Sequence, residues 1–266
     1  LVFAITLAVA VVPEALPAVV TISLAIGVQH LIKRHALVRR LPAVETLGAT
    51  SVICTDKTGT LTKDEMTVQS IYADGIEYNV SGVGYAPEGS FTIKGSPTEI
   101  DTILQRLLIA GTLSSDASLR PASEDCALGI NGDPTEGALV VAAAKAGLDQ
   151  SELNQSFPRV SEIPFTSETK RMTTIHSHQD HLVAFSKGAP EMVLPTCSFE
   201  QRNGGIFPMD ENGRSQILSA AQDLAKKALR VLAIATKDPS TKADANDDQI
   251  FLGLVGMMDP PRSEAK

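Results

Sequence analysis

A seven-residue string carries side chains suited to covalent phosphate chemistry: Asp56-Lys57-Thr58-Gly59-Thr60-Leu61-Thr62. The carboxylate of Asp56 can attack a γ-phosphoryl group and form an aspartyl-phosphate. Lys57 adds positive charge beside it, and the small Thr and Gly residues leave room for phosphate and supply donors in the turn. A Mg²⁺ ion must neutralise the phosphate oxygens, and Asp56 with the main-chain carbonyl of Thr58 can help to hold it. We therefore assign Asp56, Lys57 and Thr58 to a catalytic site.

The residues around Asp56 predict how it is presented. Residues 51–55 (Ser-Val-Ile-Cys-Thr) are typical of a short buried strand, and a Gly-containing turn follows Asp56. Parallel α/β sheets place reactive groups at the carboxyl ends of their strands in this way. Aspartate-based phosphatases of the haloacid dehalogenase type carry a second Asp as general acid/base two residues on, where this chain has Thr58. Without that base, water attacks poorly and a phosphorylated Asp56 should last longer.

The first 28 residues contain one charged side chain, Glu14. They are long enough for a membrane-spanning helix, and the basic residues within 33–40 indicate its cytoplasmic end; a buried core helix is the alternative. Two prolines within residues 13–17 break backbone hydrogen bonding, so that freed carbonyls can face an ion, although a simple kink with a hydrogen-bonded Glu14 is also open. Oxygen ligands suit a hard cation such as Ca²⁺. The expected cation ligands are Glu14, Val9, Ala10 and Val12.

The rest of the chain predicts alternating strands and helices. We expect helices at 100–113 and 216–228, and a third that begins after Asp133. In that third helix, Asp133 is the N-cap, Pro134 the first helical residue, and Glu136 the residue that closes a capping box. We expect strands at 68–72, 76–80, 171–175, 181–186, 231–235 and 251–257.

Strings along the whole chain resemble one family, the P-type ATPases. Residues 56–62 look like its phosphorylation signature, and residues 13–17 are similar to the broken fourth membrane helix of its calcium-pump-like, type II branch. Residues 40–48 look like the segment that leads to the phosphorylation site, and residues 259–262 (Asp-Pro-Pro-Arg) resemble the return hinge. The strings that resemble its nucleotide domain are 132–136, Phe165, 187–191 and 229–230.

The resemblance implies that ATP is the substrate and that six residues bind it. Phe165 would stack on adenine, and Lys187 would line the pocket. Arg230 can pair with phosphates through its guanidinium. The full implied set is Phe165, Lys187, Glu136, Thr135, Lys170 and Arg230.

Three residues depart from the family pattern. Ser167 stands where calcium pumps commonly place an Arg near the phosphates, so that contact is lost or replaced. Asp64 stands where Asn is common. Ala15 stands where Gly is more common, which leaves Glu14 in place but weakens the assignment of one ion. A transition-metal pump of the family would carry Cys in this membrane motif, and none is present.

The fold implied by the resemblance is α/β: a membrane helix, part of a haloacid-dehalogenase-like parallel α/β phosphorylation domain, and a large inserted nucleotide-binding domain of antiparallel sheet plus helices. The location would be integral to a membrane and multi-pass in the full-length protein, with residues 33–266 cytoplasmic. The expected boundaries are a membrane helix with a proline break at 1–32, a cytoplasmic stalk at 33–50, the first part of the phosphorylation domain at 51–66, the nucleotide-binding domain at 67–250, and a return strand and hinge at 251–266.

The implied partners are ATP with Mg²⁺, a transported cation, the lipid bilayer, and segments that this sequence does not contain. Those segments are an actuator domain, the loop that completes the Mg²⁺ site and the remaining membrane helices, so we expect no pumping by this chain alone. A net charge of −8 argues against a nucleic-acid partner.

The favoured function is ATP-driven cation transport through an aspartyl-phosphate at Asp56. Ca²⁺ fits best, with Na⁺, K⁺, H⁺ and Mn²⁺ open. A soluble phosphatase of related fold and a non-catalytic ATP-binding module are the alternatives. Thr58 and the apolar N-terminal segment count against the first, and the intact Asp56 and Lys57 count against the second.

Overall fold

The computed structural model describes residue 3 and residues 15–120, 128–179, 181–238, 241 and 244–265. The chain divides into two compact units, Leu1–Thr55 and Asp56–Lys266, and each is described by itself. The cation ligands expected at Val9, Ala10, Val12 and Glu14 lie outside the described residues.

The described part of the first unit contains the helices α2 (Leu16–Ile32) and α3 (Pro42–Gly48). Each has a proline in its first turn, where the missing N–H would have no helical acceptor in any case. Nowhere in the described residues is a helix both long and apolar enough to cross a membrane.

The buried strand expected at residues 51–55 does not form. Val52 is 71% and Ile53 84% exposed. The physical reason is the lack of a partner, because none of the strands that the structure describes pairs with this run. A strand without a neighbour leaves its N–H and C=O groups to water, so an apolar sequence alone cannot hold it.

The second unit is built on a large sheet in the order β4-β3-β2-β1-β13-β12-β9-β8-β7, with antiparallel neighbours throughout. β10 pairs with β13 in parallel, β11 pairs with β10, and β5 and β6 form a separate ladder. The strands are β1 (Thr67–Ala73), β2 (Ile76–Val80), β3 (Phe91–Ile93), β4 (Ser96–Pro97), β5 (Ser118–Arg120), β6 (Gly129–Asn131), β7 (Arg159–Ile163), β8 (Arg171–His178), β9 (His181–Gly188), β10 (Cys197–Arg202), β11 (Gly205–Pro208), β12 (Arg230–Lys237) and β13 (Gln249–Met258).

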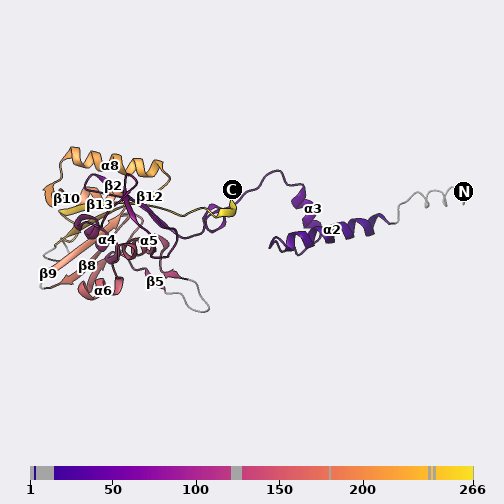
Figure 1. The fold of residues 1–266 in the computed structure, drawn as a ribbon, viewed down its shortest axis with the longest axis horizontal. Helices are drawn as coiled ribbons and strands as arrows, with labels where there is room; N and C mark the ends of the chain where they lie inside the picture. Colours follow the sequence, from indigo (N-terminus) through magenta and orange to yellow (C-terminus); the bar gives the residue numbers. More distant parts are fainter. Residues whose placement is uncertain are drawn as a thin grey trace. The chain divides into compact units, whose positions relative to one another are not determined.

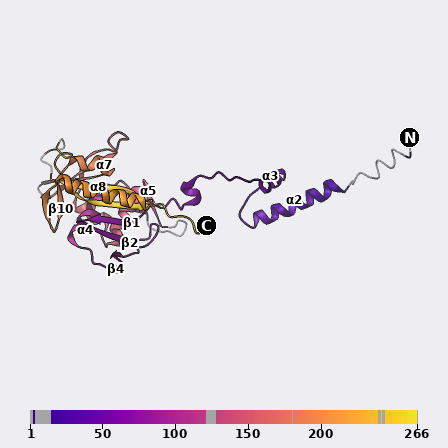
Figure 2. The same ribbon diagram turned by 90° about the horizontal axis from the view of Figure 1, so that it is seen from above.

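Helices cover both faces of this sheet. α4 (Thr102–Leu113), α5 (Pro134–Lys145) and α6 (Gln150–Ser156) lie on one face, and α8 (Glu211–Lys226) lies on the other (Figure 1). Figure 2 shows α8 from above, running along the strands that it covers. Short helical turns, α7 (Pro190–Val193), η2 (Leu194–Thr196) and η3 (Ser263–Ala265), complete the described unit.

The alternation of side chains along β12 shows why both faces need cover. Ile234 belongs to the apolar cluster that contains Leu107 of α4. Its neighbours Ala233 and Ala235 point the other way and belong to the cluster that contains Ile217 of α8. Both faces of this strand are therefore packed against apolar side chains, and the unit has three layers: helices, sheet and helix.

Most of the predicted elements are confirmed with small shifts of their ends. β2 has the predicted bounds, and the helix predicted at 216–228 is α8, which begins at Glu211 because the side chain of Asp210 accepts a hydrogen bond from Gly213 N. The strand predicted at 251–257 forms as β13. It lies between β1 and β12 in the middle of the sheet, so the domain boundary expected before residue 251 does not coincide with an edge of the sheet.

Candidate functional site

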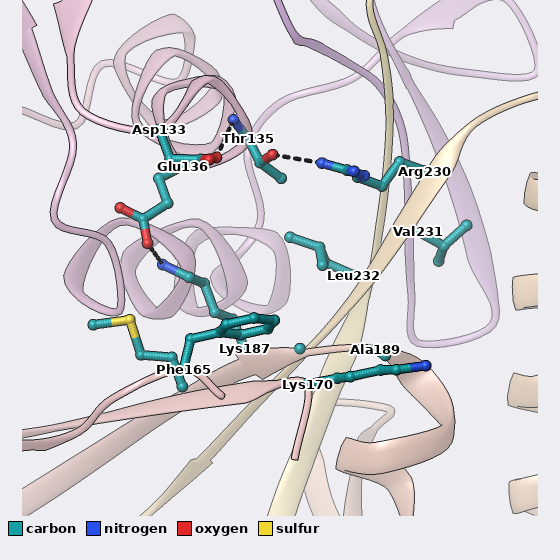
Figure 3. A pocket seen from close by; sticks show the side chains of 12 residues that line it. Asp133, Thr135, Glu136, Phe165, Lys170, Lys187, Ala189, Arg230, Val231 and Leu232 are labelled. Atoms are coloured by element: carbon teal, nitrogen blue, oxygen red, sulfur yellow. Dashed lines mark hydrogen bonds and ion pairs between the residues drawn. The ribbon is translucent and has the colours of Figure 1, made fainter. Parts of the chain in front are cut away.

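A cavity of about 500 Å³ lies where the first turn of α5, the end of β9 and the start of β12 meet. Figure 3 shows the side chains that surround it. All six residues that the sequence assigned to nucleotide binding line this one cavity. The described lining consists of Asp133, Thr135, Glu136, Phe165, Lys170, Met172, Lys187, Gly188, Ala189, Arg230, Val231 and Leu232.

Lys187 brings a buried positive charge to the cavity. It lies near the end of β9 and is 7% exposed. Its ammonium donates to Glu136 Oε1 at 2.7 Å, to Ser115 Oγ at 3.2 Å and to the main-chain oxygen of Ser114. These acceptors match the three N–H donors of a lysine. Burial lowers the pKa of Lys187, and the carboxylate of Glu136 opposes that change.

Glu136 is held at both of its carboxylate oxygens. Oε1 accepts from Lys187, while Oε2 accepts from the backbone N–H groups of Asp116 at 2.7 Å and Ala117 at 3.1 Å. The capping box expected at the start of α5 is therefore wrong in its second half. Asp133 does cap the helix by accepting from Thr135 N at 2.7 Å, but Glu136 turns away from it because the buried Lys187 needs a counter-charge.

Arg230 and Thr135 form the polar side of the cavity. Arg230 Nη1, at the start of β12, donates to Thr135 Oγ1 at 2.8 Å (Figure 3). A second cavity of about 630 Å³ shares this pair and Asp133 with the first. Its lining also includes Lys57 and Thr58, so the Arg230–Thr135 pair lies beside both cavities.

Phe165 and Lys170 lie at the exposed side of the first cavity. Phe165 is 60% exposed, which leaves apolar surface open to solvent or to a ligand. In Figure 3 the chain of Lys170 points away from the Lys187–Glu136 pair, and its Nζ lies 4.0 Å from Glu191 Oε1. Lys170 has a left-handed backbone with φ 44°, and its main-chain oxygen accepts from Ala189 N at 3.0 Å.

Gly188 allows β8 and β9 to meet at this edge of the cavity. A Cβ atom at this position would lie 2.4 Å from the main-chain oxygen of Lys170 and 2.8 Å from the Cα of Arg171. Both are backbone atoms, which cannot move aside as a flexible side chain can. The Lys187-Gly188 sequence therefore combines a charged side chain with the one residue type that fits the next position.

The turn after Asp56 is fixed to the segment that follows β13. Thr58 has an extended backbone and Gly59 has φ 72°, which glycine adopts without strain. The hydroxyl of Thr62 donates to the carboxylate of Asp259, and Arg262 Nε donates to the main-chain oxygen of Thr62 at 3.0 Å. The sequence assigned Asp56, Lys57 and Thr58 to this site and placed Thr62 in the signature and Arg262 in the return hinge, but it did not predict these contacts between the two segments.

The turn offers a partial ligand set for Mg²⁺. The carboxylate of Asp56 and the main-chain oxygen of Thr58 are hard oxygen donors, and Mg²⁺ commonly takes one or two protein oxygens and completes its shell with water and phosphate. Within the described residues, no group of three or more His, Cys, Asp or Glu side chains could hold a metal ion. These two oxygen donors fit a Mg²⁺ ion whose remaining ligands are phosphate and water.

The second unit is an α/β domain whose antiparallel sheet carries helices on both faces. Its cavity combines an exposed aromatic ring with Lys and Arg side chains, so it suits an anionic, partly aromatic ligand. The family model for the P-type ATPase, cytoplasmic domain N, matches residues 103–264. This match covers more than half of the chain, and the chain belongs to the P-type ATPase family.

Curated relatives agree with that family. The chain is 44% identical to the cation-transporting ATPase pma1 of Synechocystis sp., over 98% of this chain and 30% of that protein. It is 40% identical to calcium-transporting ATPase 1 of Bacillus cereus, over 99% of this chain and 28% of the relative. It is also 40% identical to calcium-transporting ATPase type 2C member 1 of Bos taurus, over 98% of this chain and 27% of that protein. The chain thus spans about 30% or less of each of these relatives.

Proposed function

We propose that this chain is the nucleotide-binding and phosphate-accepting part of an ATP-driven cation transporter. The observation that supports ATP binding most directly is that the six residues implied by the family resemblance all line one cavity of about 500 Å³. The adenine ring stacks on the exposed face of Phe165 in this proposal, between it and the apolar side chains of Met172 and Leu232. Lys187 supplies the positive charge on the buried side.

The phosphates extend past Thr135 and Arg230 into the second cavity, beside Lys57 and Thr58. An oxygen of the Asp56 carboxylate then forms a bond to the γ-phosphorus, and the bond from that phosphorus to the β,γ-bridging oxygen breaks. ADP leaves with the electron pair of that bond. Arg230 and Lys57 stabilise the charge that develops on the phosphate oxygens.

Mg²⁺ supplies neutralisation of the phosphate charge when it is bound, and Asp56 with the carbonyl of Thr58 would hold it. Thr58 provides no carboxylate to activate water, so the aspartyl-phosphate lasts long enough to drive a conformational change. A lasting intermediate is what distinguishes a transporter from a soluble phosphatase with the same nucleophile.

The transported ion is most simply Ca²⁺. Two of the relatives described above are named calcium-transporting, and the expected ligands at Glu14, Val9, Ala10 and Val12 are oxygen donors. In this proposal the full-length protein is integral to a membrane, residues 33–266 face the cytoplasm, and an actuator domain and further membrane helices complete the machine. Residues 51–66 would contribute to a haloacid-dehalogenase-like phosphorylation domain, and the sheet that carries the cavity, with β13 in its middle, would deliver ATP.

Calorimetric titration of ATP into the 266-residue chain tests the nucleotide site. We expect saturable binding, and we expect Lys187→Gln to weaken it at least tenfold, because a charge-assisted hydrogen bond contributes about 1.5–3 kcal/mol. Lys145→Gln is the matched control, since Lys145 Nζ also donates to backbone oxygens, those of Ser81 and Gly82, away from the cavity. Absence of ATP binding by the folded wild-type chain would overturn the proposal.

A second experiment tests phosphate acceptance in the full-length protein. We expect acid-stable labelling from γ-³²P-ATP, dependent on Ca²⁺ and absent from the Asp56→Asn variant. Labelling that survives Asp56→Asn would remove Asp56 as the acceptor. Labelling that does not respond to Ca²⁺ would overturn the choice of ion.

A further inference from the structure

Arg159 lies behind the Lys187–Glu136 pair, at the start of the edge strand β7. Its side chain is 28% exposed, and Arg159 is not among the described residues that line the cavity. Arg159 Nη2 donates to the main-chain oxygens of Leu113 at 3.2 Å and Ser115 at 2.8 Å. Arg159 Nη1 pairs with the carboxylates of Asp116 at 2.5 Å and Glu162 at 3.1 Å.

Those bonds fix residues 113–116, the segment in which α4 ends. The carbonyls at the end of a helix lack helical partners and carry partial negative charge, so a guanidinium placed there is favourable. The guanidinium bonds two carbonyls through Nη2 and two carboxylates through Nη1, whereas a lysine has only three donors, all on one nitrogen. Pairing of Arg159 with His176 in the β7–β8 ladder fixes its backbone in turn.

Among the described residues, the same segment supplies the partners of the side-chain hydrogen bonds that Lys187 and Glu136 make, other than the bond between the two. Ser114 O and Ser115 Oγ accept from Lys187, and the N–H groups of Asp116 and Ala117 donate to Glu136. Ser114 and Ala117 are fully buried, so water cannot replace the Ser114 carbonyl or the Ala117 N–H if the segment shifts.

We infer that Arg159 is a positioning residue for ligand binding: it orders residues 113–117, and this segment in turn sets the geometry of Lys187 and Glu136 in the cavity. Arg159 itself touches no ligand. This inference rests on the proposed ATP site, because ATP affinity is the property that the ordering of the pair serves.

Three variants test the inference in the 266-residue chain, with ATP as the titrant. Arg159→Gln should weaken ATP binding about five- to tenfold, the range that changes along a coupled network produce. Arg159→Lys should recover only part of this loss, because one ammonium nitrogen with three donors cannot reach all four oxygens that Nη1 and Nη2 of Arg159 bond. Arg214→Gln is the matched control: Arg214 also donates to two main-chain oxygens, those of Leu194 and Cys197, away from the cavity, so its loss should lower thermal stability but leave ATP affinity unchanged.

A double-mutant cycle separates positioning from a general structural effect. If Arg159 acts through the pair, Arg159→Gln should cost little further affinity in a Glu136→Gln background, whereas independent effects would add. Hydrogen exchange should also show faster exchange of the Asp116 and Ala117 amides in Arg159→Gln, with the amides of β12 unchanged.

Two outcomes overturn the inference while the ATP site stands: wild-type affinity in Arg159→Gln, or full additivity in the cycle. If the wild-type chain does not bind ATP, the proposed function has failed first, and the exchange of the Asp116 and Ala117 amides still decides whether Arg159 orders the segment.

Discussion

Glu136→Gln replaces one carboxylate oxygen by an NH₂ group without changing the size of the side chain. In the wild type, Lys187 donates to one oxygen of Glu136, and two backbone N–H groups donate to the other. A glutamine has a single acceptor oxygen. Whichever way the amide is turned, its NH₂ group must face either the ammonium of Lys187 or the N–H groups of Asp116 and Ala117. The variant therefore creates a conflict between donors that rotation cannot relieve.

The loss of stability follows from how little solvent reaches the pair. The side chains of Lys187 and Glu136 are 9% and 15% exposed, so water screens neither charge well. Breaking a buried ion pair by removing one partner costs about 3–5 kcal/mol, and Lys187 keeps two neutral acceptors, so we expect about 3 kcal/mol. For a unit of this size, that lowers the Tm by about 6–12 °C.

The pH dependence gives the variant a second, independent signature. The pKa of Lys187 in the folded chain is already lowered by burial, and Glu136 is the largest effect opposing this, so Glu136→Gln lowers the pKa further. Between that pKa and the ordinary lysine value of 10.5, the unfolded chain binds more protons than the folded chain, and the free energy of unfolding rises with pH. The stability difference between variant and wild type should therefore shrink as the pH rises from 7 toward 10. ATP affinity should fall over the same range, because the ammonium is lost.

Differential scanning calorimetry and ATP titration at pH 7, 8.5 and 10 measure both effects. Glu77→Gln is the matched control, because Glu77 also accepts from a lysine, Lys227, and a hydroxyl, Ser70, but is 40% exposed at its side chain. An exposed pair contributes about 0.5 kcal/mol, so its Tm should move by no more than about 2 °C. Equal Tm values for the two variants would refute the reasoning about burial. A stability difference that grows with pH would refute the sign of the lysine titration.

Three further predictions test separate parts of the site. Phe165→Ala should weaken ATP binding about tenfold with little change in Tm, because the ring is largely exposed and base stacking contributes about 1–3 kcal/mol; Phe207→Ala, an exposed Phe on β11, should leave affinity unchanged. Gly188→Ala should cost about 2–3 kcal/mol by calorimetry, since its Cβ would meet backbone atoms of Lys170 and Arg171, and a wild-type Tm would contradict this. Burial lowers the pKa of His176 below its ordinary value of 6.5, and within the described part of the chain its Nε2 has no hydrogen-bond partner. As the pH falls through 6.5, the unfolded chain therefore binds a proton at His176 at a higher pH than the folded chain does. The free energy of unfolding should fall as the pH drops below about 6.5, and His176→Gln should make this decrease smaller when unfolding is measured by calorimetry across that pH range.

Local patterns in the sequence predicted the elements that carry the cavity. The helix after Asp133 and the strands before Lys187 and after Arg230 were predicted because capping residues and short apolar runs act over a few positions. The six candidate ligand-binding residues came from resemblance, and the topology that gathers them was not readable from the sequence. β9 and β12 pair with Ile234 opposite Lys187, a register fixed by packing on both faces of the sheet.

The predictions from the sequence that the structure contradicts have a common cause: the structure at those residues depends on partners that are distant in the sequence. The apolar run at 51–55 has strand composition but no neighbour among the described strands, whereas the edge strand β7 has weak composition and is held by pairing with β8. Arg159 follows a proline in an unremarkable stretch, and its role depends on the end of a helix more than forty residues earlier. Glu136 was read as a helix cap because its nearest partner in sequence is Asp133, while its actual partner, Lys187, is supplied by the sheet.

The sheet also relates the nucleotide cavity to the turn that follows Asp56. Arg230 pairs with Met257 in the β12–β13 ladder, and β13 ends at Met258, next to Asp259. Asp259 accepts from Thr62, so the turn is attached to the strand that neighbours Arg230. In the proposed function, an ATP molecule bound at Phe165 and Lys187 has its phosphates guided by Arg230, and the same β12–β13 register places Arg230 relative to the turn. A change that shifts this register would therefore impair phosphate transfer even with the nucleotide cavity and Asp56 both intact.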